Sequence, residues 1–338
     1  MNAEDVYKKV EGSIVQVFSA SINPYLVSER YSAGTGTSFV YGDGLLLTNY
    51  HVIADAHDIV AFSDDTFIPV NIVGVDPTLD IALLEPWFPF PPEQSLEPTA
   101  APDVRIGQNV FAIGYPLGIG KTISAGVISG KGRVLPRTTS SWLVPFLQTD
   151  AAVSPGNSGG PLVDDCGNLM GMITAGIFEY GAEDIGFAIP IEVLEPVVEE
   201  LIDKGYVSRP WHGLFGQMTF PPILQVMGTP QEEWEDTHGF LIETIEPGSA
   251  ADRAGLHGGN WPMMWGQNEI LLGGDIITHV DGQRIADLDT ALAVVRSLEI
   301  GSAVKIDFIR DGMHMDSTID IEERPLLERE LEVYRHRR

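Results

Sequence analysis

The chain has 338 residues, and its 48 acidic against 20 basic side chains give it a formal net charge of −28. This length corresponds to about two domains, and the 44% content of hydrophobic residues excludes a disordered acidic polymer. A surface so acidic repels phosphate and anionic lipid, so we expect no nucleic-acid partner and no binding to a membrane surface. No apolar run approaches the 18 residues of a membrane-spanning helix, so we expect no membrane insertion.

Cys166 is the only cysteine, which excludes an intrachain disulfide and a zinc site built from several cysteines. Its neighbours, Asp164, Asp165, Gly167 and Asn168, are typical of a turn. We therefore expect neither a bound metal nor a cofactor. The residues after Met1 lack a basic segment followed by an apolar one, as a leader would have, so at face value the chain is cytoplasmic.

The first part of the chain, residues 1–207, consists mainly of short apolar segments separated by Gly, Pro and Asp. Many β-branched residues and regular turn signals predict an antiparallel sandwich or barrel. Helices are predicted at Glu4–Val10 and Ile191–Asp203, and the second ends before Gly205. Examples of the predicted strands are Ser13–Phe18, Thr37–Tyr41, Leu45–Thr48, Ile59–Phe62, Ile81–Leu84, Val110–Ile113, Thr122–Val127, Leu162–Val163 and Leu169–Ala175.

The second part, residues 208–323, combines predicted strands with one helix, Leu288–Leu298. Its strands are expected at Gly239–Ile245, Asp275–Val280 and Ala303–Ile309. Residues 324–338 form a tail with the spacing of a short amphipathic helix. The expected fold is mostly β, with two domains and a short tail.

Three segments bring together the residue types of nucleophilic catalysis: His51 after an apolar strand, Asp80 before one, and Ser158 among glycines. A serine hydroxyl attacks only if its proton is removed, and imidazole has the pKa to accept that proton. A buried carboxylate then fixes the imidazole tautomer. The chain order His, Asp, Ser and the proline after Gly160 exclude the α/β-hydrolase arrangement, in which a helix follows the serine.

The partner of His51 has two candidates. We prefer Asp80 because the apolar strand after it would bury its carboxylate, whereas Asp76 precedes a proline and is expected in an exposed turn. The glycine before Asn157 and Ser158 predicts an unusual turn that aims the N–H groups of Gly156 and Ser158 at one oxyanion. The two glycines after Ser158 would let a substrate backbone pass close to the nucleophile.

These motifs resemble those of the HtrA/Deg serine proteases over residues 4–322. The matching segments are Thr48–Ile53, Asp80–Leu84, Gly114–Gly118, Gln148–Ala152, Gly156–Pro161, Ile185–Pro190, His212–Gly216, Ile245–Ala251, Ala254–Leu256, Gly274–Ile277 and Val280–Gly282. The resemblance implies two chymotrypsin-like six-stranded β-barrels followed by one α+β PDZ domain. It also implies an ATP-independent endopeptidase that cleaves unfolded or damaged proteins, forms trimers and commonly works outside the cytoplasm.

The resemblance assigns the general base to His51, its orienting acid to Asp80, the nucleophile to Ser158 and the oxyanion hole to Gly156, Asn157 and Ser158. Apolar walls from Val153, Gly176 and Ile177 imply cleavage after small or medium aliphatic residues. In the PDZ domain, peptide C-termini would bind between a carboxylate loop and a helix. The residues concerned are Leu214, Phe215, Gly216, Gln217, Leu292 and Val295.

The sequence also departs from the family at three positions, Tyr50, Ile173 and Gln217, and in an insertion at residues 257–273. Two interpretations of this insertion remain open: it covers its own PDZ core, or it packs on the protease domain or a neighbouring subunit. An alternative function is a catalytically silent scaffold or chaperone that binds unfolded chains.

Overall fold

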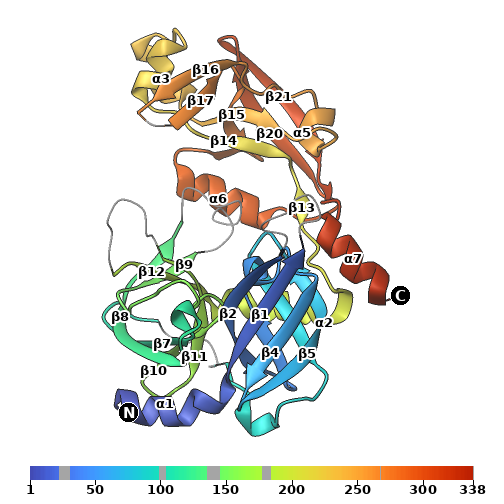
Figure 1. Ribbon diagram of the computed structural model, residues 1–338. Coiled ribbons are helices and arrows are strands. Elements are labelled where there is room, and N and C mark those ends of the chain that lie inside the picture. Colours follow the sequence, from blue (N-terminus) through green and yellow to red (C-terminus); the bar gives the residue numbers. More distant parts are fainter. Residues whose placement is uncertain (23–30, 99–103, 135–144, 177–183, 267, 338) are drawn as a thin grey trace. The chain divides into compact units, whose positions relative to one another are not determined.

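The structure is a computed structural model that describes residues 1–22, 31–98, 104–134, 145–176, 184–266 and 268–337 (Figure 1). The chain divides into two compact units, one of Met1–Val207 with Leu326–Arg338 and the other of Ser208–Pro325. The C-terminal residues therefore return to the first unit after the second is complete. No helix of the described residues is both long and apolar enough to cross a membrane.

The first unit contains two closed antiparallel barrels of six strands each, which confirms the expected fold. The first barrel follows the order β1-β2-β3-β6-β5-β4 and the second the order β10-β11-β12-β9-β8-β7. The strands are β1 (Ile14–Ile22), β2 (Tyr31–Tyr41), β3 (Leu45–Thr48), β4 (Asp58–Ser63), β5 (Thr66–Asp76), β6 (Ile81–Pro86), β7 (Asn109–Gly114), β8 (Thr122–Arg133), β9 (Phe146–Thr149), β10 (Pro161–Asp164), β11 (Leu169–Gly176) and β12 (Gly186–Pro190).

Three of these strands, β5, β9 and β12, are not among the strands named from the sequence. β5 contains Pro69 and Asn71, and both interrupt a strand pattern. In β12 all five residues are buried, so no alternation of polar and apolar residues marks it. Strands of this kind are defined by their partners in the barrel, which the local sequence does not contain.

Two predicted helices pack on the barrels. α1 (Ala3–Val10) begins at Asn2, whose side chain accepts a hydrogen bond from the N–H of Asp5, and it buries Val6 and Val10. α2 (Ile191–Lys204) ends at Gly205, where a φ of 85° requires glycine. Both helices contribute to the largest apolar core of the unit, which includes side chains of both barrels such as Phe39 and Met172.

The C-terminal helix α7 (Glu328–Arg337) packs on β5 of the first barrel. Val333 is buried in the core of that barrel, and Arg329 donates a hydrogen bond to the carbonyl of Ala56, 3.0 Å away. Ala56 lies five residues after His51. The predicted tail is therefore a structural part of the first barrel, beside the loop that carries the histidine.

The second unit is a sheet of order β14-β15-β18-β20-β21, with β19 paired to β18. Its strands are β14 (Leu214–Met218), β15 (Phe240–Ile245), β18 (Ile276–Val280), β19 (Gln283–Arg284), β20 (Ala303–Arg310) and β21 (Met313–Asp320). Its short helices are α3 (Pro221–Val226), α4 (Trp234–Thr237) and α5 (Ala250–Arg253). The longer α6 (Leu288–Ser297) starts at Asp287, whose side chain accepts a hydrogen bond from the N–H of Thr290. A two-residue ladder of β13 (Pro210–Trp211) with β22 (Glu322–Glu323) joins the entry and exit of the chain.

The insertion at 257–273 contains a hairpin of β16 (Trp261–Trp265) and β17 (Asn268–Leu272). Ile270 and Leu272 of this hairpin are buried against Ile223 and Leu241 in a separate apolar cluster. The insertion therefore covers a core of its own unit, as one of the two interpretations expects. Docking of the insertion on another domain or subunit stays a prediction.

Candidate active site

His51 and Asp80 meet at the mouth of the first barrel. His51 lies in a short 3-10 turn after β3, and Asp80 stands immediately before β6, which pairs with β3. Nδ1 of His51 lies 2.7 Å from Oδ2 of Asp80, and the N–H of His51 donates to Oδ1 at 2.8 Å. The carboxylate thus holds both the ring and the backbone of the histidine, which is the arrangement that fixes an imidazole tautomer.

The reason given for preferring Asp80 over Asp76 is wrong, although the geometry places Asp80 beside His51. Asp76 is fully buried, and it accepts hydrogen bonds from the N–H groups of Thr78 and Leu79. The side chain of Asp80 is 20% exposed. Asp76 therefore caps the turn that delivers Asp80, and burial alone does not distinguish the two acids.

Asp80 and Asn49 stabilise the histidine turn through the backbone as well. Asp80 has a φ of 60°, a left-handed conformation that aspartate tolerates better than most residues. Its carbonyl accepts hydrogen bonds from the N–H of Tyr50 and from the side-chain amide of Asn49. Tyr50 contacts the barrel core and lies near charged residues of α7, so this departure from the family pattern lies apart from the cavity lining.

Ser158 and His51 line the same cavity, whose volume is about 400 Å³. The hydroxyl of Ser158 donates to the carbonyl of Thr174, 3.3 Å away, and among the described residues it forms no hydrogen bond with His51. The hydroxyl of Thr174 donates to Oδ2 of Asp80 at 2.9 Å. Thr174 of β11 therefore contacts both the acid and the nucleophile, and no motif in the sequence had identified it.

The turn before Ser158 supports an oxyanion hole built by two of the three predicted residues. Among the described residues, no acceptor bonds the N–H of Gly156 or of Ser158, and both residues line the cavity. Gly156 has a φ of 100°, and a Cβ there would lie 2.4 Å from the carbonyl oxygen of Tyr115. The N–H of Asn157 is bonded to the carbonyl of Ser154 at 2.9 Å, so it is unavailable to an oxyanion.

Thr37 holds this turn from the opposite barrel. Its hydroxyl donates to the carbonyl of Gly156 at 2.6 Å and accepts from the N–H of Tyr115. Its N–H donates to the carbonyl of Ser158. The role expected for Gly159 is wrong, because a Cβ there would lie 2.1 Å from the carbonyl of Thr37. The glycines after Ser158 allow the two barrels to approach, and they are buried away from a substrate.

The residues proposed for the specificity pocket are only partly described. Val153 is half-buried, and a Cβ on Gly186 would lie 2.6 Å from its Cγ2. Gly186 pairs with Gly176, the last residue of β11. Val153 and Gly176 thus lie at the same end of the second barrel, whereas Ile177 falls outside the described residues.

The environment of His51 favours the protonated ring. Burial by itself lowers the pKa of His51, but the hydrogen bond and the negative charge of Asp80 outweigh this effect, and the net pKa is raised above 6.5. A raised pKa makes the imidazole a stronger base for the proton of Ser158. The side chain of His51 is half exposed, so substrate and solvent can reach it.

In the second unit, an apolar cavity of about 80 Å³ lies among β14, β18, β20 and α6. Leu214 and Val295, both predicted to bind peptides, line it. Phe215, Gly216, Gln217 and Leu292 are absent from its lining. Phe215 is half exposed, Gln217 donates from its amide to Glu243, and a Cβ on Gly216 would collide with the carbonyl of Leu241.

The segment predicted as the carboxylate loop lies in a strand, and only its first residue, Leu214, lines the cavity. Leu214–Gln217 belongs to the edge strand β14, and the residue that lines the cavity from the loop before it is His212. The sequence analysis did not single out His212, whose place in the lining depends on the packing of the loop against α6 and the sheet.

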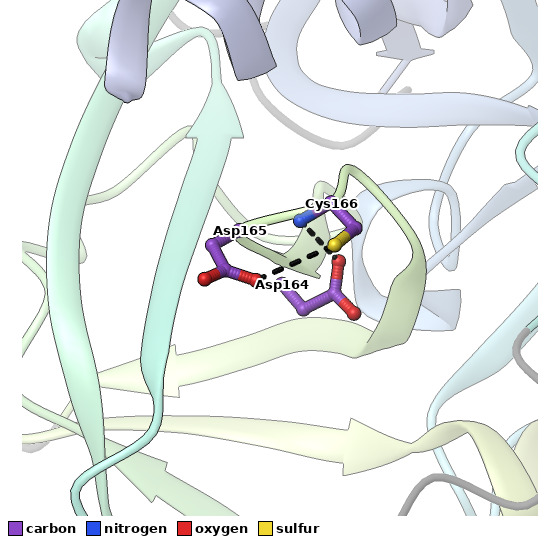
Figure 2. A group of neighbouring side chains, drawn as sticks. All are labelled: Asp164, Asp165 and Cys166. Carbon is purple, nitrogen blue, oxygen red and sulfur yellow. Dashed lines mark hydrogen bonds between the residues drawn. The ribbon is translucent and has the colours of Figure 1, made fainter. Parts of the chain in front are cut away.

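Figure 2 shows three metal-binding residue types together, Asp164, Asp165 and Cys166, in the turn after β10. Asp164 accepts hydrogen bonds from the N–H groups of Cys166 and Asn168 and from the side-chain amide of Asn168. The two aspartates raise the pKa of the Cys166 thiol, chiefly through the charge of Asp164. The cluster is thus a tight turn with a protonated thiol, and α1 is anchored to it through Lys9, whose Nζ donates to the carbonyl of Cys166.

Comparison with known proteins agrees with both units. The trypsin-like peptidase domain family matches residues 34–172, and the PDZ domain family matches residues 226–321. Protease Do-like 1, chloroplastic, of Arabidopsis thaliana is 33% identical over 298 residues, which are 86% of this chain and 64% of that protein. A probable periplasmic serine endoprotease DegP-like of Halomonas elongata is 32% identical over 300 residues, which are 88% of this chain and 58% of that protein. The chain thus spans less than two thirds of the length of these relatives.

Solved structures give the same result. An HtrA-type protease, AlgW with decapeptide, superposes with a TM-score of 0.75 at 27% identity, covering 97% of this chain and 100% of that one. A serine endoprotease from Yersinia pestis superposes with a TM-score of 0.68 at 26% identity, covering 96% and 99% of the two chains. Because both domain families match in order and the relatives align along most of the chain, the protein belongs to the HtrA/Deg family of serine proteases with a PDZ domain.

Proposed function

We propose that the protein is a serine endopeptidase that hydrolyses peptide bonds through an acyl-enzyme on Ser158. The observation that carries this proposal is the bond of 2.7 Å between His51 and Asp80 beside a cavity that Ser158 also lines. His51 accepts the proton of the Ser158 hydroxyl as Oγ attacks the scissile carbonyl, and it then donates that proton to the leaving amine. The N–H groups of Gly156 and Ser158 bind the oxyanion of the tetrahedral intermediate.

In the described structure the Ser158 hydroxyl bonds to Thr174. Attack requires it to rotate toward His51, a rotation about one side-chain bond that substrate binding can drive. This resting geometry is also the observation that favours the scaffold or chaperone function, in which the protein binds unfolded chains without cleaving them.

A casein digest with Ser158→Ala separates the two functions. We expect the parent to degrade casein, Ser158→Ala to lose the activity by at least 10³-fold, and Ser302→Ala, a hydroxyl removed in the second unit, to retain it. A phosphonofluoridate should label the parent at Ser158 and leave Ser158→Ala unlabelled. Equal degradation by the parent and Ser158→Ala would refute the protease, and the absence of degradation and labelling in both would favour the scaffold.

Substrates of this enzyme would be unfolded or damaged proteins cleaved after small or medium aliphatic residues. The half-buried Val153 and the side-chain-free Gly176 and Gly186 support this choice, since together they offer an apolar wall with no carboxylate. A cleavage profile from a peptide library checks it, and a profile dominated by Lys or Arg before the cleaved bond would overturn it.

The second unit would bind peptide C-termini at β14, which has a free edge among the described residues. Function outside the cytoplasm is supported by the relative from Halomonas elongata, which is described as a probable periplasmic endoprotease. A homotrimer is the assembly expected of the family. Cell fractionation and light scattering of the purified chain test these two proposals.

A further inference from the structure

His212 occupies an unusual position in the peptide groove of the second unit. It lies in the loop that leads into β14, and it lines the small cavity together with side chains of α6 such as Ala291 and Val295. All the other side chains that line the cavity are hydrocarbon, among them Leu214, Ile277, Val295 and Val304. Within this lining, His212 is the residue that can gain a charge.

The imidazole of His212 is bonded to the strand that would receive a peptide. Its Nδ1 accepts the N–H of Leu214 at 3.0 Å. The N–H of Glu246 donates to the carbonyl of Gly213, so this end of β14 pairs with β15 through Gly213. In an antiparallel ladder the next N–H points the opposite way, which places that of Leu214 on the free edge. This N–H is therefore one that an incoming C-terminal carboxylate would need, and the ring of the same loop already occupies it.

The bond also fixes the protonation state of the ring. Because Nδ1 accepts a hydrogen bond, it carries no proton, and the imidazole is neutral. Burial lowers the pKa of His212, and the carboxylate of Glu246 opposes this effect without reversing it. Glu246 is itself bonded to Nε1 of Trp211, 2.6 Å away. From α5, the side chain of Asp252 bonds the N–H of Gly248, and α6 presents apolar side chains to the cavity.

We propose that His212 is a proton-controlled gate of the peptide groove: the neutral ring caps the N–H of Leu214, and the protonated ring releases it and donates to the C-terminal carboxylate. The step takes one proton from solvent to Nδ1, breaks the hydrogen bond from Leu214, and replaces it with two donors aimed at one anion. The inference rests on the proposed binding of peptide C-termini by this unit.

The expected pH dependence of the peptide affinity follows from the coupling between protonation of His212 and binding of the peptide. The carboxylate of a bound peptide favours the imidazolium, so binding takes up a proton wherever the free ring is neutral. Uptake of one proton tightens binding by at most tenfold per pH unit. Since the pKa of the free ring is lowered, the free ring is neutral over most of the range from pH 8.0 to 5.5, so affinity should rise as the pH falls across it, by at most tenfold for each pH unit.

The test uses the full chain carrying Ser158→Ala, so that the probe is not cleaved. The probe is a fluorescein-labelled peptide without His, Asp or Glu that ends in valine with a free carboxylate, compared with its C-terminal amide. Fluorescence anisotropy gives the Kd from pH 5.5 to 8.0, and calorimetry in two buffers of different ionisation enthalpy gives the protons taken up.

Three variants sharpen the outcome. His212→Leu removes the cap, so we expect tight binding that does not change with pH. His212→Asn retains an acceptor that can bond two residues ahead but does not titrate, so we expect weak binding at every pH. His314→Gln changes an exposed histidine of β21 and should retain the parent's pH profile.

The possible outcomes test the role of His212 separately from the binding of peptide C-termini by the second unit. If the parent and His212→Leu bind the carboxylate peptide equally at all pH values, the gate is refuted while C-terminal binding stands. If neither binds it more tightly than the amide, both the gate and the proposed binding of C-termini are refuted. Proton uptake that persists in His212→Leu would assign the coupling to another group and also overturn the gate.

Discussion

Replacing Asp80 with asparagine tests the assignment of the catalytic acid most directly. The carboxylate of Asp80 accepts three hydrogen bonds, from the backbone N–H of His51 at 2.8 Å, from its Nδ1 at 2.7 Å and from the hydroxyl of Thr174 at 2.9 Å. An amide has one accepting oxygen. If that oxygen accepts the backbone N–H, the NH₂ group faces the ring, Nδ1 must become the acceptor, and the proton moves to Nε2.

The expected loss of catalytic rate follows from this replacement of a carboxylate by an amide. A hydrogen bond to a charged group contributes about 1.5–3 kcal/mol, which corresponds to roughly tenfold to 150-fold in rate when it is lost. The wrong tautomer adds to this because Nε2 can no longer accept the proton of Ser158. In total we expect kcat to fall by about 10³–10⁴-fold for Asp80→Asn. The measurement is kcat and KM on a fluorogenic peptide with an aliphatic residue before the cleaved bond.

Asp76→Asn is the matched control, since Asp76 is an acid four residues away that caps a turn and does not contact the ring. An asparagine oxygen can still accept the N–H groups of Thr78 and Leu79, so we expect activity within about fivefold of the parent. The reasoning would be refuted if Asp80→Asn retained more than a tenth of the parent's kcat, or if Asp76→Asn lost as much, with both variants folded by circular dichroism.

The pH dependence of kcat/KM is a second measurement that tests the Asp80→Asn substitution. His51 acts as a base only when neutral, and its pKa is raised above 6.5, so kcat/KM of the parent should fall as the pH drops through that pKa. In Asp80→Asn only the burial remains, which lowers the pKa, so the residual activity should extend to lower pH. For stability the sign is opposite: the His51–Asp80 pair stabilises the fold fully below pH 6.5 and loses this contribution as the pH rises through the raised pKa. An acid limb at the same pH in both proteins would contradict the role of Asp80.

Three further substitutions test the oxyanion turn, the hairpin core of the second unit and the packing of α7 on the first barrel. Gly156→Ala forces a Cβ to within 2.4 Å of the Tyr115 carbonyl at a φ of 100°, so kcat should fall at least 10²-fold with little change in KM; unchanged kinetics would exclude Gly156 from the oxyanion hole. Leu272→Ala, in the hairpin core, should lower the free energy of unfolding by about 2–5 kcal/mol in urea denaturation, whereas exposed Met264→Ala should cost less than about 0.5 kcal/mol; equal effects would mean that the hairpin covers nothing. Val333→Ala should destabilise the first barrel by roughly 1–3 kcal/mol, and a Tm equal to the parent's would show that α7 does not pack there.

Local chemistry explains why some elements were predictable. The helices α1, α2 and α6 carry their own start or stop residues, Asn2, Gly205 and Asp287, and one apolar face each. The motif around Ser158 is likewise a short local pattern, although the reason for its glycine is a distant contact: a Cβ on Gly156 would lie 2.4 Å from the carbonyl oxygen of Tyr115. The start and stop signals of the helices depend on neighbours within a few residues, which the sequence contains.

The residues that the sequence did not reveal depend on contacts between distant segments. Thr174 became a site residue only because β11 carries it to Asp80, 94 residues earlier in the chain. Thr37 contacts the oxyanion turn 119 residues later. A threonine in a strand has no distinguishing local pattern, and both are recognised only when the two barrels close.

The sequence by itself indicated the family and the order of the three catalytic residue types through short motifs, and its strand pattern predicted a sandwich or barrel. The two six-stranded barrels and the PDZ domain were expected because the motifs resemble those of the family. Only the tertiary structure decided that Asp76 is the buried cap and Asp80 the partner of His51, that the insertion covers its own core, and that His212 bonds the free edge of β14. The physical reason is that each of these outcomes is a contact of a few ångströms between groups whose separation is set by packing and strand register, which no local stretch of the chain contains.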